Sequence, residues 1–131
     1  MQKNTLESPV ILIVEDHESL RKTLVTWLTD LFPHSSISQA STGEESIALA
    51  GRIHPDIILM DIGLPGISGI EATLEICRRG IQTKIVVLTN LDGDIYRQSA
   101  FEAGAVEFIA KQEMSKKLPS VLSRLINYLP N

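Results

Sequence analysis

At residues 57–61 the chain reads IILMD, four apolar residues followed directly by Asp61. Three other apolar runs end on polar residues: Val10–Val14 precedes Glu15 and Asp16, Ile85–Leu88 precedes Thr89, and Val106–Ala110 precedes Lys111. Continuous apolar runs of this length are typical of strands buried on both faces of a parallel sheet. Open parallel sheets bind ligands at the carboxyl ends of their strands. We therefore expect these polar side chains to converge on one site for a divalent cation and a phosphoryl group.

Length and composition indicate one globular domain. The chain has 131 residues, of which 44% are apolar and 21% charged. A net charge of −4 without a basic stripe disfavours nucleic-acid binding by this chain. No apolar run approaches the ~20 residues of a membrane span, and the polar residues 1–9, without a signal-peptide core, are expected to form a flexible lead-in. The single cysteine, Cys77, forms no disulfide framework, which favours a cytoplasmic location.

Helical patterns lie between the apolar runs. Apolar residues recur at helical spacing from Leu20 to Leu31, and Asp94–Ala103 is a short helix ended by Gly104. Pro33, Pro55 and Gly80, the last as a C-cap, mark predicted helix ends. The predicted helix starts are the capping-box spacings at Ser41–Glu44 and Ser68–Glu71, and Pro119 in the first turn of a last helix. Ser35–Ala40 is a weaker segment, interpreted as an edge strand.

Five strand–helix units follow from this pattern. With right-handed crossovers they predict an α/β, doubly wound (βα)5 flavodoxin-like domain. Its parallel five-stranded sheet has the order 2-1-3-4-5, with helices on both faces.

The acids at the strand ends point to metal and phosphoryl chemistry. Clustered carboxylates repel one another when ionised, and such oxygen ligands suit Mg²⁺. A carboxylate such as Asp61 can form an acyl phosphate, while the Lys111 ammonium neutralises phosphate oxygens and the Thr89 hydroxyl donates to them. Taken singly, each residue has a plainer interpretation: Glu15 and Asp16 as a helix cap, Lys111 as a surface lysine, Thr89 as a turn residue. Their joint order favours a shared site.

This joint order resembles the receiver domain of bacterial two-component response regulators, over Pro9 to Leu129. The motifs that carry the resemblance are Glu15-Asp16-His17, Asp61-Ile62-Gly63-Leu64-Pro65 with Gly69, Thr89, and Gly104-Ala105 leading to Lys111. The resemblance implies that Asp61 is the phosphoacceptor and that a sensor histidine kinase supplies the phosphoryl group from its own phosphohistidine. The chain would then be a switch that catalyses only its own phosphorylation and dephosphorylation, and not a turnover enzyme.

The same resemblance assigns roles to further residues. The implied Mg²⁺ ligands are the carboxylates of Asp16 and Asp61, the backbone carbonyl of Gly63 and, through water, Glu15. Thr89 and Phe108 match the switch positions, so the Thr89 hydroxyl would move toward the phosphoryl group and the Phe108 ring would rotate inward. The surface of the fourth helix, fifth strand and fifth helix would then change its preference for partners.

Three positions near the site depart from the family pattern. Asn90 stands where a small residue is frequent, and its larger side chain is expected to narrow access to Asp61. Gly63 and Leu91 stand where rapidly hydrolysing members carry polar side chains. Neither residue can orient an attacking water, so we predict a long-lived acyl phosphate.

The sequence therefore predicts a receiver domain over residues 10–131. Gln112, in place of the proline that usually follows Lys111, and the Asp16-His17 pair favour receivers of LuxR/NarL-type transcriptional regulators. The expected partners are the kinase, a LuxR-type DNA-binding domain in a longer parent chain, and a second copy bound through the fourth or fifth helix.

Other functions remain open at this point. The first is a stand-alone or degenerate receiver that acts as a protein-interaction scaffold. The second is an Asp-nucleophile phosphatase, which Gly63 argues against because phosphatases of the haloacid-dehalogenase type carry a second Asp, the general acid, at that position. The third is a flavodoxin-like cofactor binder, which the acids Glu15 and Asp16 argue against because they repel phosphate.

Overall fold

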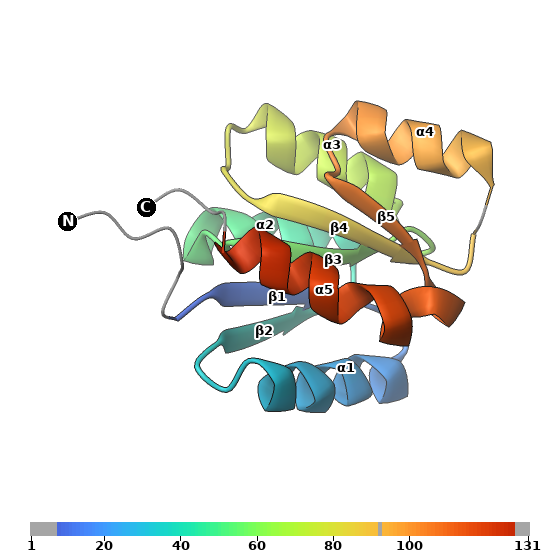
Figure 1. Cartoon of the computed structure of the whole chain (residues 1–131). Helices are drawn as coiled ribbons and strands as arrows, with labels where there is room; N and C mark the ends of the chain where they lie inside the picture. Colours follow the sequence, from blue (N-terminus) through green and yellow to red (C-terminus); the bar gives the residue numbers. More distant parts are fainter. Residues whose placement is uncertain (1–7, 92, 128–131) are drawn as a thin grey trace.

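The structure is a computed structural model that describes residues 8–91 and 93–127. Five parallel strands form one sheet in the order β2-β1-β3-β4-β5 (Figure 1). Their bounds are Val10–Val14 (β1), Ser36–Ala40 (β2), Ile57–Asp61 (β3), Lys84–Thr89 (β4) and Glu107–Ala110 (β5). The predicted strand order and the edge position of β2 are confirmed.

Helices cover both faces of the sheet. Within the described residues they are Glu18–Leu31 (α1), Gly43–Ile53 (α2), Gly69–Arg78 (α3), Asp94–Ala103 (α4) and Met114–Asn127 (α5), with a 3₁₀ turn at Lys111–Glu113 (η1). Helices α1 and α5 lie on one face, and α2, α3 and α4 lie on the other (Figure 1). The predicted doubly wound α/β fold is therefore confirmed.

Apolar side chains fill the layers between sheet and helices. Successive residues of a strand point to opposite faces, so Ile11 and Ile13 of β1 belong to the core under α1 and α5, whereas Leu12 and Val14 belong to the core under α2 and α3. Strand β3 is buried along its whole length, Asp61 included. Burial on both faces explains why the central strands read as uninterrupted apolar runs.

Two helix starts differ from the prediction. The N-cap of α2 is Thr42 and not Ser41, because the Thr42 hydroxyl accepts from the Glu45 N–H at 3.0 Å while the Glu45 carboxylate accepts from the Ser41 N–H at 2.8 Å. Pro119 lies inside α5 and not in its first turn. The turn before this proline is helical because its Leu118 side chain is fully buried in the core.

Other boundaries follow the predicted signals closely. Ser68 caps α3 in a complete capping box with Glu71, and Gly104 ends α4 in the left-handed region with φ 120°. Gly80 is not the C-cap of α3 itself but the residue after it, with φ 76°, which is the position where helices favour a left-handed glycine. Val106 precedes β5 and does not belong to it.

Both chain ends extend beyond the described residues. Residues 1–7 of the predicted lead-in and residues 128–131 of the predicted domain lie outside them. Pro9 is buried, and its carbonyl accepts from the Ser36 N–H at 2.8 Å, so the chain is attached to β2 before β1 begins. Among the helices described, none has the length and apolar character needed to cross a membrane.

Candidate functional site

The carboxyl ends of four strands bring the predicted side chains to one edge of the sheet. Asp61 and Thr89 are the last residues of β3 and β4, while Glu15 and Lys111 directly follow β1 and β5. Glu15, Asp61 and Thr89 are buried, with 2%, 5% and 1% of their surface exposed. Buried polar groups are costly unless they are paired, so their mutual contacts decide what the site can do.

Lys111 lies between two carboxylates. Its Nζ is 2.7 Å from Glu15 Oε1 and 3.5 Å from Asp61 Oδ2. Burial raises the pKa of Glu15, but hydrogen bonds from Lys111 and His17 outweigh burial and bring this pKa below its ordinary value. The pKa of Asp61 is raised, because burial and the neighbouring Glu15 charge exceed the effect of Lys111. Lys111 therefore forms its shorter ion pair with Glu15, and the negative charge of Asp61 is only partly neutralised.

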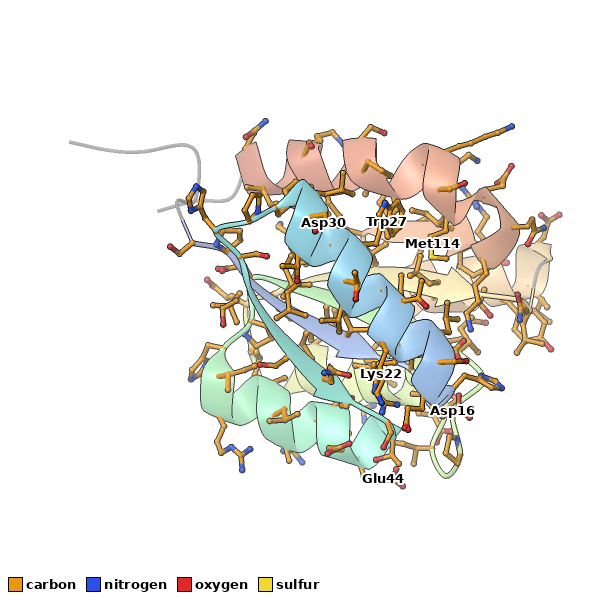
Figure 2. All side chains as sticks on the ribbon, turned by 90° about the horizontal axis from the view of Figure 1, so that it is seen from below. Asp16, Lys22, Trp27, Asp30, Glu44 and Met114 are labelled. Atoms are coloured by element: carbon orange, nitrogen blue, oxygen red, sulfur yellow. The ribbon has the colours of Figure 1, made fainter. Side chains whose placement is uncertain are left out.

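Asp16 carries an oxygen suited to a cation, at the N-terminal end of α1 (Figure 2). Its Oδ1 is buried and has no hydrogen-bond partner within the described residues, since His17 Nδ1 is 3.6 Å away. Ligand atoms of Glu15, Asp16 and His17 lie within 4.8 Å of one another. A buried, unpartnered carboxylate oxygen beside other acids fits a hard divalent cation such as Mg²⁺. Both Glu15 oxygens are already hydrogen-bonded, so contact through water suits Glu15 better than direct ligation.

The turn after Asp61 is held against the N-terminus of α3. The Gly63 N–H points to Asp61 Oδ1 at 3.4 Å, and the Gly69 N–H donates to the Ile62 carbonyl at 2.9 Å. A Cβ on Gly69 would lie 2.0 Å from the Asp61 carbonyl oxygen, so only glycine allows α3 to approach so closely. A Cβ on Gly63, in contrast, would meet nothing within 4 Å.

Thr89 and the two residues after it form the opposite wall. The Thr89 hydroxyl accepts from the Leu91 N–H at 2.8 Å, which fixes the path of the chain after β4. The side chains of Asn90 and Leu91 are exposed. The predicted effects of Asn90 on access and of Leu91 on hydrolysis stay predictions.

The Phe108 ring is already inside the protein. It is 6% exposed and belongs to a small buried cluster with Ile62, Val87 and Ala100. Ile62 directly follows Asp61, so this cluster borders the site. The predicted rotation of the ring on phosphorylation stays a prediction, and in this structure its starting position is the buried one.

Arg21 is a site residue that sequence reasoning missed. Its Nη1 donates to the Glu15 carbonyl at 2.9 Å, and its Nε donates to Gln39 Oε1 at 3.0 Å. One guanidinium therefore ties the acid pair at the end of β1 to the edge strand β2. In the sequence Arg21 is an ordinary polar residue in the first turn of an amphipathic helix, and nothing in this position signals the contact.

Comparisons with known proteins decide the family. Residues 11–123 match the family model described as the response regulator receiver domain. The chain belongs to this family. This receiver domain is similar to the transcriptional regulatory protein LiaR of Bacillus subtilis (strain 168), with 36% identity over 112 residues that cover 86% of this chain and 53% of LiaR. It is also similar to the response regulator GacA of Pseudomonas viridiflava, with 35% identity over 101 residues that cover 77% of this chain and 47% of GacA.

Solved structures agree with this assignment. A two-component response regulator of the LuxR family from Aurantimonas sp. SI85-9A1 has a TM-score of 0.82 and 28% identity, over 90% of this chain and 85% of that one. The predicted family, its relation to LuxR-family regulators and a role in two-component signalling are confirmed. This receiver domain spans about half the length of the curated relatives it matches. Family members bind Mg²⁺ at an acidic pocket and work with sensor kinases and output domains.

Proposed function

We propose that this receiver domain accepts a phosphoryl group on Asp61 from the phosphohistidine of a sensor histidine kinase, in a Mg²⁺-dependent reaction in the cytoplasm. The phosphorylated form then controls transcription through a LuxR-type DNA-binding domain in a longer parent chain. The observation that carries the proposal is the setting of Asp61, a buried carboxylate 3.5 Å from the Lys111 ammonium and incompletely neutralised by it.

The transfer step needs little covalent chemistry from the protein. An oxygen of the ionised Asp61 carboxylate attacks phosphorus, and the phosphorus–nitrogen bond of the phosphohistidine breaks. The electron pair of that bond stays on the imidazole nitrogen, which takes up a proton from water. The products are an acyl phosphate on Asp61 and a neutral histidine on the kinase, and the domain contributes position and charge neutralisation.

The acid pair and the turn after β3 would hold the metal. Asp16, Asp61 and the backbone carbonyl of Gly63 are the proposed ligands, with Glu15 acting through water. When bound there, Mg²⁺ would neutralise charge on the phosphoryl oxygens. The unpartnered Oδ1 of Asp16 supports its role as a direct ligand, and the two occupied oxygens of Glu15 support its indirect role.

Lys111, Thr89 and Phe108 would convert the new phosphoryl group into a conformational change. Lys111 Nζ is close enough to Asp61 to reach a phosphoryl oxygen, and the Thr89 hydroxyl lies at the neighbouring strand end. The phosphoryl group shifts the domain only if it binds the active state better than the inactive one. Among the described residues, Gly63 has no side chain and Leu91 is apolar, which supports slow hydrolysis of the acyl phosphate.

A protein partner on the α4 face fits the exposed apolar residues of this helix. Ile95 is 73% exposed and Phe101 is 39% exposed. These side chains support a second copy of this chain as the partner there, as predicted for the fourth helix.

Intact mass after incubation with acetyl phosphate and Mg²⁺ tests the proposal. The wild type should gain one phosphoryl group, and the gain should disappear in Asp61→Asn and when EDTA removes Mg²⁺. Asp30→Asn is the matched control, because Asp30 is an exposed acid at the far end of α1 from Asp16 (Figure 2). If neither acetyl phosphate nor a cognate kinase phosphorylates the wild type, the scaffold function replaces the switch.

A further inference from the structure

Helix α4 is attached to the rest of the domain by few buried side chains. Of its ten residues, Asp94–Ala103, only Ala100 and Ala103 are buried, and both are small. Its larger apolar residues are exposed, Ile95 at 73% and Phe101 at 39%. The position of this helix must therefore depend on contacts other than apolar burial.

Arg97 supplies such a contact. Its guanidinium carbon lies 5.6 Å from the centre of the Phe101 ring and 5.5 Å from the centre of the Phe108 ring. Both distances are within the range of cation–π attraction. Within the described part of the chain, no carboxylate lies within 4.0 Å of the Arg97 guanidinium, so its positive charge acts on the two aromatic rings. One cation of α4 thus contacts an exposed ring of the same helix and a buried ring of β5.

The buried ring connects this contact to the site. Phe108 pairs with Val87 in the β4–β5 register, two residues before Thr89, and it stands three residues before Lys111. Its cluster includes Ile62, the residue after Asp61. A group that holds the Phe108 ring in place therefore acts on the strands that carry the Thr89 hydroxyl and the Lys111 ammonium.

We propose that Arg97 is a positioning residue that clamps the Phe108 ring in its buried position before phosphorylation, and that this clamp favours phosphorylation of Asp61. The second half rests on the proposed function, in which the inward ring is the state that the phosphoryl group stabilises. Any contact that stabilises that state in advance raises the population ready to be phosphorylated. The exposed position of Arg97 limits the effect to a factor of about two to five.

Fluorine NMR of protein labelled with fluorophenylalanine tests the clamp without phosphorylation. The chain has three phenylalanines, Phe32, Phe101 and Phe108, and Phe108→Leu assigns the critical signal. The shift of each signal between H₂O and D₂O reports solvent exposure of its ring, with Phe32, which packs against the core on the opposite face of the sheet, as an internal reference. In Arg97→Gln, a change that keeps helix propensity, the solvent shift of Phe108 should rise relative to that of Phe32.

The rate of phosphorylation by acetyl phosphate tests the coupling. It should fall about two- to fivefold in Arg97→Gln and recover most of that loss in Arg97→Lys, which restores the cation. Arg52→Gln is the matched control, because Arg52 is exposed on α2 and its loss changes the net charge equally. This control should match the wild type in both measurements.

Each result decides part of the proposal. An unchanged solvent shift of Phe108 in Arg97→Gln overturns the clamp, even if the rate falls. A raised solvent shift with an unchanged rate overturns the coupling to Asp61. If the wild type takes no phosphoryl group from any donor, the proposed function fails, while the solvent shift still decides whether Arg97 holds the ring.

Discussion

Replacing Gly69 by alanine would show how strictly α3 positions Asp61. The added Cβ would lie 2.0 Å from the Asp61 carbonyl oxygen, whereas ordinary contacts begin at 3.4 Å, so helix and strand must separate by about 1.4 Å (3.4 − 2.0). Overpacking of this kind costs about 1–3 kcal/mol of unfolding free energy. A displacement of about 1 Å at a reacting group can slow the chemistry about 10²-fold. We therefore expect Gly69→Ala to fold with reduced stability and to be phosphorylated about ten- to a hundredfold more slowly.

Urea unfolding and the acetyl phosphate rate measure the two effects. Gly51→Ala is the control, because a Cβ at this position meets nothing within 4 Å. Gly51 lies inside α2, so its replacement should stabilise the domain by about 0.5–1 kcal/mol. Surface substitutions usually change the unfolding free energy by less than about 0.5 kcal/mol. If Gly69→Ala lowers the unfolding free energy by no more than that and is phosphorylated at the wild-type rate, Gly69 does not position Asp61 in this way.

Three further predictions concern charge, metal and hydrolysis. Burial and the Glu15 charge raise the pKa of Asp61, so ionisation of Asp61 destabilises the folded state as the pH rises. In urea unfolding without Mg²⁺, Asp61→Asn should therefore have a higher unfolding free energy than the wild type at pH 7. This difference should shrink as the pH falls toward 3.8, the ordinary pKa of Asp. Arg21→Met should weaken Mg²⁺ binding about two- to tenfold in calorimetry by freeing the Glu15 carbonyl, whereas Lys22→Met, the exposed neighbour, should not. The acyl phosphate of the wild type should have a half-life of minutes or longer and not of seconds. Gly63→Asn combined with Leu91→Gln should shorten this half-life about tenfold or more, because the two polar side chains can orient an attacking water.

The fold was predictable because its determinants are local or periodic. Strands buried on both faces must be apolar throughout, and parallel strands need a crossover, so four apolar runs separated by helical patterns leave few alternatives. The capping box at Ser68 and the stop at Gly104 depend on neighbouring residues alone, and both predictions hold. Pro119 was placed wrongly because the helical turn before it depends on burial of Leu118, a contact with residues far away in the sequence.

The sequence predicted which polar side chains gather at the site, but not which of them pair with one another. Strand ends dictate that Glu15, Asp61 and Lys111 gather at one edge. Which carboxylate takes the shorter contact with Lys111 depends on side-chain rotamers across 96 residues of sequence. The contacts of Arg21 and Arg97 were not predicted for the same reason. Each is a polar residue of an amphipathic helix, and it contacts a residue outside that helix.

The pairing of Lys111 bears on how the proposed switch changes state. At rest the ammonium is 2.7 Å from Glu15 and 3.5 Å from Asp61, so the buried Glu15 depends on it for neutralisation. A phosphoryl group on Asp61 would carry about two negative charges and compete with a single carboxylate for the same ammonium. If Lys111 moves to the phosphoryl group, Glu15 keeps only its hydrogen bonds from His17 and becomes an uncompensated buried charge. A divalent cation beside Asp16 would relieve that charge, so we expect the phosphorylated state, like the proposed transfer, to depend on the metal.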